Sequence, residues 1–227
     1  MSVPLYDFCK TNERLTDIGA EVYYSCCGKY ICKGCVYSLV ESGTEETCPF
    51  CKAKTMDKTY EETFEEYNMR VEANDAGAMC VLGADYYHGW FGLQQDRARA
   101  MKLWKRAAEI GSSQAHFFLG TDYYEGGDLK KAKFHYEAGA MAGNEVARFN
   151  IGCIEKRTGD MERAVKHWII AASAGDYNAM HQLRKFFEKG VVSRESIDTT
   201  LAAYNTSCAE MRSEARDNVI QFEMERE

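Results

Sequence analysis

Small and aromatic residues recur at a fixed interval of 32 along the second half of the chain. Five columns keep this interval: Asp96, Asp128 and Asp160; Ala100, Ala132 and Ala164; Trp104, Tyr136 and Trp168; Ala108, Ala140 and Ala172; and Gly111, Gly143 and Gly175. A second set alternates with the first: Ala115, Ala147 and Ala179; Leu119, Ile151 and Leu183; and Gly120 and Gly152. A period of about 20 to 50 residues is typical of stacked structural repeats.

Each repeat predicts two helices. The second helix begins at the aspartate, whose carboxylate accepts backbone N–H bonds as an N-cap, and ends at the glycine, which suits the left-handed position after a helix. Its alanine and aromatic positions are four residues apart and so share one face. The first helix carries a mid-helix glycine, which costs about 1 kcal/mol relative to alanine and therefore indicates close packing. Since one helix pair cannot bury its own apolar face, the pattern predicts a mostly α protein with an α-solenoid.

The repeats are predicted to cover residues 75–190, as three full copies and one partial copy. The first copy, at Ala78, Leu82 and Gly83, precedes the next by 37 residues, and the five extra residues fall in a predicted loop around positions 90–94. Aromatic residues in this loop either pack on the neighbouring helix or contact a partner. The fourth copy, residues 179–190, keeps only its first helix.

Two further helices are predicted on either side of the repeats. Residues 57–74 are acidic and predict a linker helix. Residues 191–227 predict a C-terminal capping helix with Ser193 as its N-cap, because apolar residues recur every three or four positions at Ile197, Leu201, Tyr204, Cys208 and Met211. This last helix either caps the final repeat or binds a partner.

The composition is that of a globular protein, with 45% hydrophobic and 28% charged residues and a net charge of −7. Nucleic acid is excluded as a main partner, because its binding depends on Lys and Arg that neutralise phosphates. No apolar stretch reaches the roughly 18 residues of a membrane span, and the N-terminus lacks the apolar region of a signal peptide. We therefore expect a cytoplasmic or nuclear protein without membrane contact, in a reducing compartment where disulfides are rare.

Seven of the ten cysteines lie in the first 51 residues: Cys9, Cys26, Cys27, Cys32, Cys35, Cys48 and Cys51. Cys32–Cys35 and Cys48–Cys51 are two C-x2-C pairs, a spacing that places two thiolates on one metal ion. A disulfide pair is the weaker interpretation in a reducing compartment. Residues 1–56 are too few to build a sufficient apolar core, so we expect structural zinc as a cofactor whose binding stabilises the folded module.

The order of these cysteines resembles the RING family of zinc-binding domains, in which four ligand pairs bind two zinc ions. Pairs one and three bind one ion in that family, and pairs two and four bind the other. The resemblance assigns Cys9, Cys32 and Cys35 to a first site, and Cys26, Cys27, Cys48 and Cys51 to a second.

The first site lacks a ligand, because Tyr6 stands where the family has a cysteine. Asp7 or a water molecule could complete it, or the natural start could lie upstream of Met1. In pair two, Lys29 occupies the position of the family's histidine, and the adjacent Cys26 and Cys27 could instead supply both sulfurs.

The RING resemblance implies a ubiquitin ligase, which activates a ubiquitin-conjugating enzyme and has no covalent catalytic residue of its own. The positions that contact this enzyme in the family match Phe8, Leu39, Pro49 and Lys52. The alternative is a non-enzymatic scaffold in which the degenerate module is only structural.

The repeat columns, A-x3-LG-x2-Y-x2-G and AA-x2-G, resemble Sel1-like repeats, which are relatives of the tetratricopeptide repeat. This resemblance implies an adaptor that binds other proteins on the concave face of the solenoid. The histidines lie in the repeats without the spacing of a metal site, so we expect structural roles for them: His88, His116, His135, His167 and His181.

Overall fold

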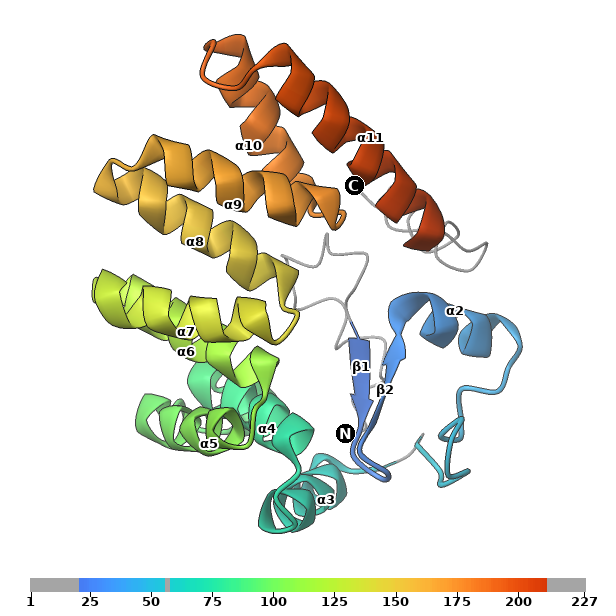
Figure 1. The fold of residues 1–227 in the computed structure, drawn as a ribbon. Helices are drawn as coiled ribbons and strands as arrows, with labels where there is room; N and C mark the ends of the chain where they lie inside the picture. Colours follow the sequence, from blue (N-terminus) through green and yellow to red (C-terminus); the bar gives the residue numbers. More distant parts are fainter. Residues whose placement is uncertain (1–20, 56–57, 212–227) are drawn as a thin grey trace. The chain divides into compact units, whose positions relative to one another are not determined.

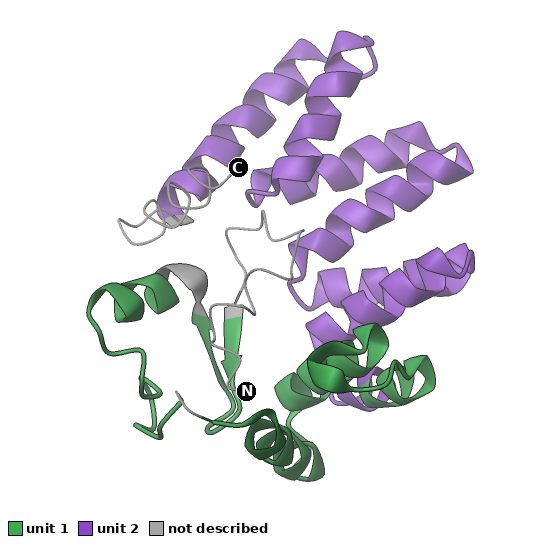
Figure 2. Cartoon of the chain, turned by 180° about the vertical axis from the view of Figure 1, so that it is seen from behind, with its two compact units in different colours: residues 1–103, 212–227 green, residues 104–211 purple. Residues whose placement is uncertain are grey.

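The computed structural model describes residues 21–55 and 58–211 of the chain (Figure 1). These residues form one two-stranded sheet and ten α-helices, so the predicted mostly α fold is confirmed. The chain divides into two compact units (Figure 2): residues 1–103 with 212–227, and residues 104–211. In the described part of the chain, no helix is both long and apolar enough to span a membrane.

The first unit begins with an antiparallel hairpin of β1 (Glu21–Tyr24) and β2 (Lys29–Cys32), in which Tyr23 pairs with Tyr30. The turn closes at Gly28, whose φ of 71° lies in the left-handed region that favours glycine. Helix α2 (Lys33–Glu41) follows directly, and an irregular segment then leads to the next helix.

In the described part of the first unit, two further helices follow before the chain enters α5. Helix α3 (Tyr60–Glu72) begins with a capping box, in which Thr59 accepts from the Glu62 N–H and the Glu62 carboxylate accepts from the Thr59 N–H. Helix α4 (Ala76–His88) is capped by Asp75 and ends at Gly89 in the left-handed conformation. A short 3-10 turn, η1 (Trp90–Gly92), leads into α5 (Arg97–Glu109), within which the two units divide.

Polar contacts fasten the hairpin to α3 and α4. The Tyr23 hydroxyl donates to the Asp75 carboxylate at 2.7 Å, and the Ser25 hydroxyl donates to Glu66 at 2.7 Å. Arg70 donates to the Ser25 carbonyl and pairs with Asp75 at 3.3 Å. Asp75 therefore serves both as the N-cap of the first repeat helix and as an anchor for the hairpin.

The second unit consists of antiparallel helices from the end of α5 to α11. The helices that follow α5 are α6 (Ser113–Glu125), α7 (Leu129–Met141), α8 (Glu145–Thr158), α9 (Met161–Ser173), α10 (Tyr177–Glu188) and α11 (Arg194–Met211). The predicted N-caps at Asp128 and Asp160 are confirmed, because each carboxylate accepts the backbone N–H three residues later, at 3.1 and 3.0 Å.

The glycine of each first helix provides the space for the aromatic residue of the second. A Cβ atom on Gly120 would lie 2.6 Å from Tyr136 Cδ1, and one on Gly152 would lie 2.5 Å from Trp168 Nε1. Tyr136 and Trp168 are in turn almost fully buried. The recurring glycine and aromatic positions of the sequence thus correspond to one contact, between the glycine of the first helix and the aromatic ring of the second, which is repeated in successive helix pairs.

Helix α11 closes the last apolar cluster of the solenoid. Ser193 accepts the Ser196 N–H at 3.1 Å and so caps the helix as predicted. Ile197 is buried in a cluster with Trp168 and Leu183, and Leu201 and Tyr204 pack against the same cluster. These contacts agree with the capping interpretation of the C-terminal helix.

Candidate metal centre and the repeat surface

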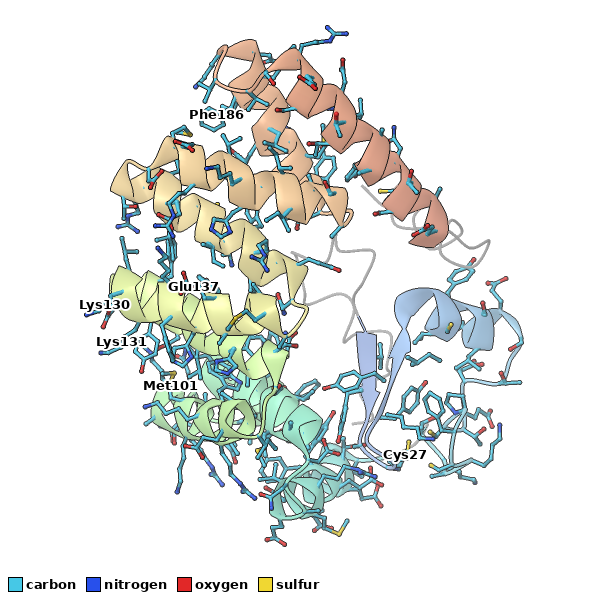
Figure 3. All side chains as sticks on the ribbon, in the orientation of Figure 1. Cys27, Met101, Lys130, Lys131, Glu137 and Phe186 are labelled. Atoms are coloured by element: carbon cyan, nitrogen blue, oxygen red, sulfur yellow. The ribbon has the colours of Figure 1, made fainter. Side chains whose placement is uncertain are left out.

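Two tight turns present the four cysteines of the predicted second site. Cys26 and Cys27 lie in the turn of the β1–β2 hairpin, where the N–H groups of Cys27 and Gly28 both donate to the Tyr24 carbonyl. Figure 3 labels Cys27 on this turn.

The turn that holds Cys48 and Cys51 has a similar backbone structure. The Lys52 N–H donates to the Cys48 carbonyl at 3.0 Å, and the Cys48 N–H donates to the Ala53 carbonyl at 2.8 Å. Lys52 takes a φ of 62°, the left-handed conformation that Gly28 has in the first turn. A bridge between Thr47 and Lys54 closes the base of the turn.

The structure brings the four thiols of these turns together, although they come from segments about twenty residues apart. Their sulfur atoms all lie within 4.8 Å of one another. The Cys27 and Cys48 sulfurs are 3.6 Å apart, and those of Cys26 and Cys51 are 3.5 Å apart. Zn–S bonds of about 2.3 Å in a tetrahedron separate the sulfurs by about 3.8 Å, whereas a disulfide needs about 2.05 Å. The spacing therefore fits four ligands of one metal ion.

The thiol environments differ within this cluster. Cys48 is fully buried, which raises its pKa, but backbone N–H groups of Cys51 and Phe50 and the thiols of Cys26 and Cys27 outweigh the burial and lower the pKa to about 7. Burial raises the pKa of Cys26 and of Cys27. The turn at Cys48 thus stabilises a thiolate, the form that binds a metal.

Aromatic packing holds the two turns against each other. The rings of Tyr24 and Phe50 meet edge to face with their centroids 6.2 Å apart. The Lys29 ammonium lies 5.1 Å from the centroid of Phe50. Lys29, which occupies the position of the family's histidine, therefore faces an aromatic ring.

Several residues of the RING prediction lie outside the described residues, namely Tyr6, Asp7, Phe8 and Cys9. Of the other predicted first-site ligands, Cys32 ends β2 and the exposed Cys35 lies in α2. The incomplete first site stays a prediction. Among the predicted enzyme contacts, Leu39 in α2 and Pro49 in the second turn are half-buried, and Lys52 is exposed.

A contact between a cation and an aromatic ring recurs in the repeats and was not predicted from the sequence. Arg99 lies over the ring of Tyr86 at 4.3 Å, and Lys131 lies over the ring of Tyr123 at 5.3 Å. One repeat further on, the cation is Arg163 and the aromatic residue is replaced by glutamate. The motif spacing could have shown this exchange, because the tyrosine of A-x3-LG-x2-Y falls on position 155 in the third copy.

Glu155 is therefore a buried carboxylate in a position that is aromatic in the other repeats. Its side chain is 5% exposed and lies 2.6 Å from Lys133 of α7 and 3.3 Å from Arg163 of α9. In Figure 3, the labels of Lys131 and Glu137 mark the position of α7. One carboxylate thus links two successive repeats.

A second buried carboxylate, Asp85 of α4, was also missed. Asp85 is 1% exposed, and neither of its carboxylate oxygens has a hydrogen-bond partner among the described residues. Burial raises its pKa from 3.8 to about 7. The acidic side chain is therefore poorly suited to its site at neutral pH, when much of it must be charged.

Two histidines meet between α6 and α7. The Nδ1 atoms of His116 and His135 lie 3.1 Å apart, and the ring of Tyr123 stacks on His135. Burial, followed by the proximity of His116 and Lys105, lowers the pKa of His135 to about 4. The two rings thus meet in a contact between neighbouring helices, and the structural role expected for the histidines stays a prediction.

Comparison with known proteins identifies the repeats. Residues 76–112, 113–144 and 151–176 match the Sel1 repeat. The chain is similar to the crystal structure of a Sel1 repeat protein from Oxalobacter formigenes, with a TM-score of 0.58 and 23% identity over 77% of this chain and 71% of that chain. No curated protein matches the chain in sequence.

A second similar structure is that of a protective antigen with an SLR fold, present in uropathogenic Escherichia coli strains. It has a TM-score of 0.56 and 20% identity, and the match covers 79% of this chain and 41% of the antigen. The chain thus spans about two fifths of the antigen's length. These likenesses establish an α-solenoid fold built on Sel1 repeats.

Proposed function

We propose that this protein is an adaptor in which a zinc-bound, RING-like module is joined to a protein-binding Sel1 solenoid. The observation that carries the proposal is the convergence of four cysteine sulfurs within 4.8 Å in a chain whose residues 76–112, 113–144 and 151–176 match the Sel1 repeat. The module offers no covalent chemistry of its own, so its role is to bind and position other proteins.

Zinc is the metal we propose for this cluster. Four thiolates in a tetrahedron are the ligand set of closed structural zinc sites, and such sites leave no position open for a substrate. Bound zinc would cross-link the hairpin turn at Cys26 and Cys27 to the turn at Cys48 and Cys51. Since residues 21–55 contribute few buried apolar side chains, this cross-link would supply much of their folding free energy.

Metal analysis of the purified full chain tests the zinc proposal. Protein prepared under reducing conditions should retain about one tightly bound zinc ion after dialysis, and more than one beforehand if the first site also binds. Cys48→Ser should lose the tightly bound ion, whereas Cys80→Ser, which changes a buried cysteine of α4, should keep it. Wild-type protein without zinc would contradict the proposal.

Protein binding by the solenoid rests on the exposed surfaces of the repeat helices. Phe134 and Met141 of α7 and Ile170 of α9 are more than half exposed, so their apolar side chains are available for contact with a partner. Cross-linking mass spectrometry on captured partners is the direct test. Partners should cross-link mainly to residues 60–188, and cross-links confined to residues 21–55 would oppose the solenoid's adaptor role.

Ubiquitin ligase activity is a second candidate, favoured by the geometry around Lys52. Its side chain is exposed directly after the proposed ligand Cys51, and it makes no ion pair with the described residues. Phe50 beside it is 42% exposed. A cation and an apolar surface at this position match the RING contacts to a ubiquitin-conjugating enzyme.

Discharge of ubiquitin from a panel of conjugating enzymes tests this candidate. Lys52→Ala should slow discharge severalfold without loss of zinc, because Lys52 is not a ligand. Lys54→Ala provides the matched control, since Lys54 is an exposed lysine two residues further along. If the wild-type protein stimulates no enzyme in the panel, the scaffold function remains and the ligase candidate is dropped.

A further inference from the structure

The loop between α4 and α5 is five residues longer than its counterparts, and a rigid set of contacts holds it. The Asp96 N–H donates to the Tyr86 carbonyl at 2.8 Å, and the Gln95 side chain donates to the Tyr87 carbonyl at 2.8 Å. Phe91 takes a φ of 55°, rare for a bulky residue, and stacks on Tyr60 of α3 with centroids 5.1 Å apart. The insertion is therefore ordered and packed against α3.

This loop forms one wall of a groove within the first unit. The groove has a volume of about 580 Å³, within the range of ligand-binding clefts. It is lined by Phe64 of α3, Tyr86 of α4, Leu93, Gln94, Gln95 and Asp96 of the loop, and Arg99 of α5. The rings of Phe64 and Tyr86 meet edge to face and give the groove an aromatic side.

Arg99 differs from its counterparts in the other repeats. Lys131 pairs with the Asp128 carboxylate at 2.9 Å, and Arg163 pairs with Glu155 at 3.3 Å. The Arg99 guanidinium lies over the Tyr86 ring at 4.3 Å and has no carboxylate partner among the residues that the structure describes. A guanidinium stacked on an aromatic ring is held in place while its N–H edges remain open to a bidentate acceptor.

The charges around the groove restrict what could bind there. The Asp96 carboxylate, which accepts the Arg99 backbone N–H at 2.8 Å, lines the groove itself. Helix α3 carries exposed carboxylates at Glu61 and Glu65, and these charges would repel a long acidic run. A segment with one carboxylate beside an apolar side chain avoids this repulsion. Its carboxylate would meet Arg99, its apolar side chain would cover Phe64 and Leu93, and its backbone could bond to the exposed Gln94 amide.

We propose that this groove binds an extended peptide segment of a partner protein, with an Asp or Glu side chain on Arg99 and a neighbouring apolar side chain on the aromatic wall. The proposal rests on the adaptor function and narrows it to one partner chemistry. It places a specific contact in the first repeat, at the only repeat loop of the described chain that carries the five-residue insertion.

Selection from a displayed library of random twelve-residue peptides, on the immobilised full chain, tests the proposal. Enriched peptides should share an acidic residue next to an apolar one. Their synthetic forms should bind Arg99→Gln at least tenfold more weakly than the wild-type protein. Lys102→Gln, which removes a neighbouring exposed cation of α5, should leave binding unchanged, and replacement of the peptide's acid by its amide should weaken binding as Arg99→Gln does.

Three results would overturn the groove assignment. Enriched peptides that bind Arg99→Gln as well as wild type would support the adaptor function at another surface. Failure to enrich any peptide would remove the peptide-binding groove but leave the cross-linking test of the solenoid decisive for the adaptor function. Self-association of the wild-type chain that Arg99→Gln abolishes would identify a second copy as the occupant.

Discussion

In the cysteine-bearing unit, polar contacts fasten the hairpin to α3 and α4, whereas the helices of residues 104–211 meet largely through apolar contacts. The hairpin reaches α3 and α4 through Tyr23, Ser25 and Arg70, and its turns meet at four thiols. The helices of the second unit meet through repeated glycine–aromatic contacts such as Gly152 with Trp168. Together with the proposed zinc site, this difference leads us to expect that the stability of the first unit depends on a metal ion and on pH, whereas that of the second depends on the close fit of its side chains.

The largest expected effect comes from breaking an aromatic contact of the second unit. Trp168→Ala should lower the free energy of unfolding by about 3–5 kcal/mol, because the ring is fully buried and its removal leaves a cavity. Phe134→Ala, a change at a side chain 64% exposed, should cost less than about 1 kcal/mol. Urea denaturation of the full chain, followed by circular dichroism, measures both, and equal losses would refute the packing account.

The buried Asp85 should make the first unit sensitive to pH. Because its pKa is raised from 3.8 to about 7 in the folded state, its contribution to stability is present below pH 3.8 and is lost as the pH rises to about 7. Asp85→Asn should therefore raise the free energy of unfolding at pH 8 by about 2–4 kcal/mol.

Chemical denaturation at pH 5 and at pH 8 measures this effect of Asp85. The gain from Asp85→Asn should be larger at pH 8 than at pH 5. Glu65→Gln, on the exposed face of α3, serves as the control and should have no comparable pH dependence. A destabilising effect of Asp85→Asn at pH 8 would mean that the carboxylate has a partner it needs.

A substitution at Glu155 can replace an ion pair with a cation–ring contact at one site. Glu155→Ala should cost about 2 kcal/mol, because it leaves Lys133 and Arg163 without their shared carboxylate. Glu155→Tyr should cost less, since it restores the cation–ring pair of the other repeats. Thermal unfolding compares the two variants, and a greater loss with tyrosine would show that the site cannot take the aromatic residue.

The smallest effect is expected from the polar contacts of the hairpin. Arg70→Ala should cost about 1 kcal/mol, since the Arg70–Asp75 pair is partly exposed to solvent. Hydrogen exchange should quicken in the hairpin and α3, while α8 and α9 stay protected. Arg106→Ala, on α5, provides a comparison at another arginine, and equal exchange in the hairpin of both variants would remove the role of Arg70 as an anchor.

The repeat pattern predicted the helices closely, because a helix and its two ends are determined by residues close together in the sequence. Aspartate caps and glycine ends follow from local backbone geometry, and the 32-residue columns record contacts between adjacent helices. The Lys133–Glu155 and His116–His135 contacts were missed, since each joins residues whose partnership has no fixed spacing. The hairpin anchors were missed for the same reason: Tyr23 and Asp75 are 52 residues apart.

The cysteine cluster shows how far a motif can predict a site. The pairing of Cys26 and Cys27 with Cys48 and Cys51 came from the order of ligand pairs in a resembling family, and the structure brings these four thiols together. The sequence did not predict that Lys52 would take the left-handed conformation in its turn or that Tyr24 and Phe50 would pack between the turns. Both depend on the three-dimensional approach of the two segments.

Hydrogen exchange of the full chain, combined with metal analysis before and after a strong chelator, tests most directly the claim that only the first unit depends on metal. We predict that removal of the tightly bound zinc ion increases exchange in residues 21–55 and in α3, while residues 113–188 keep their protection. Release of zinc with no change in residues 21–55, or equal loss of protection in both units, would contradict the account.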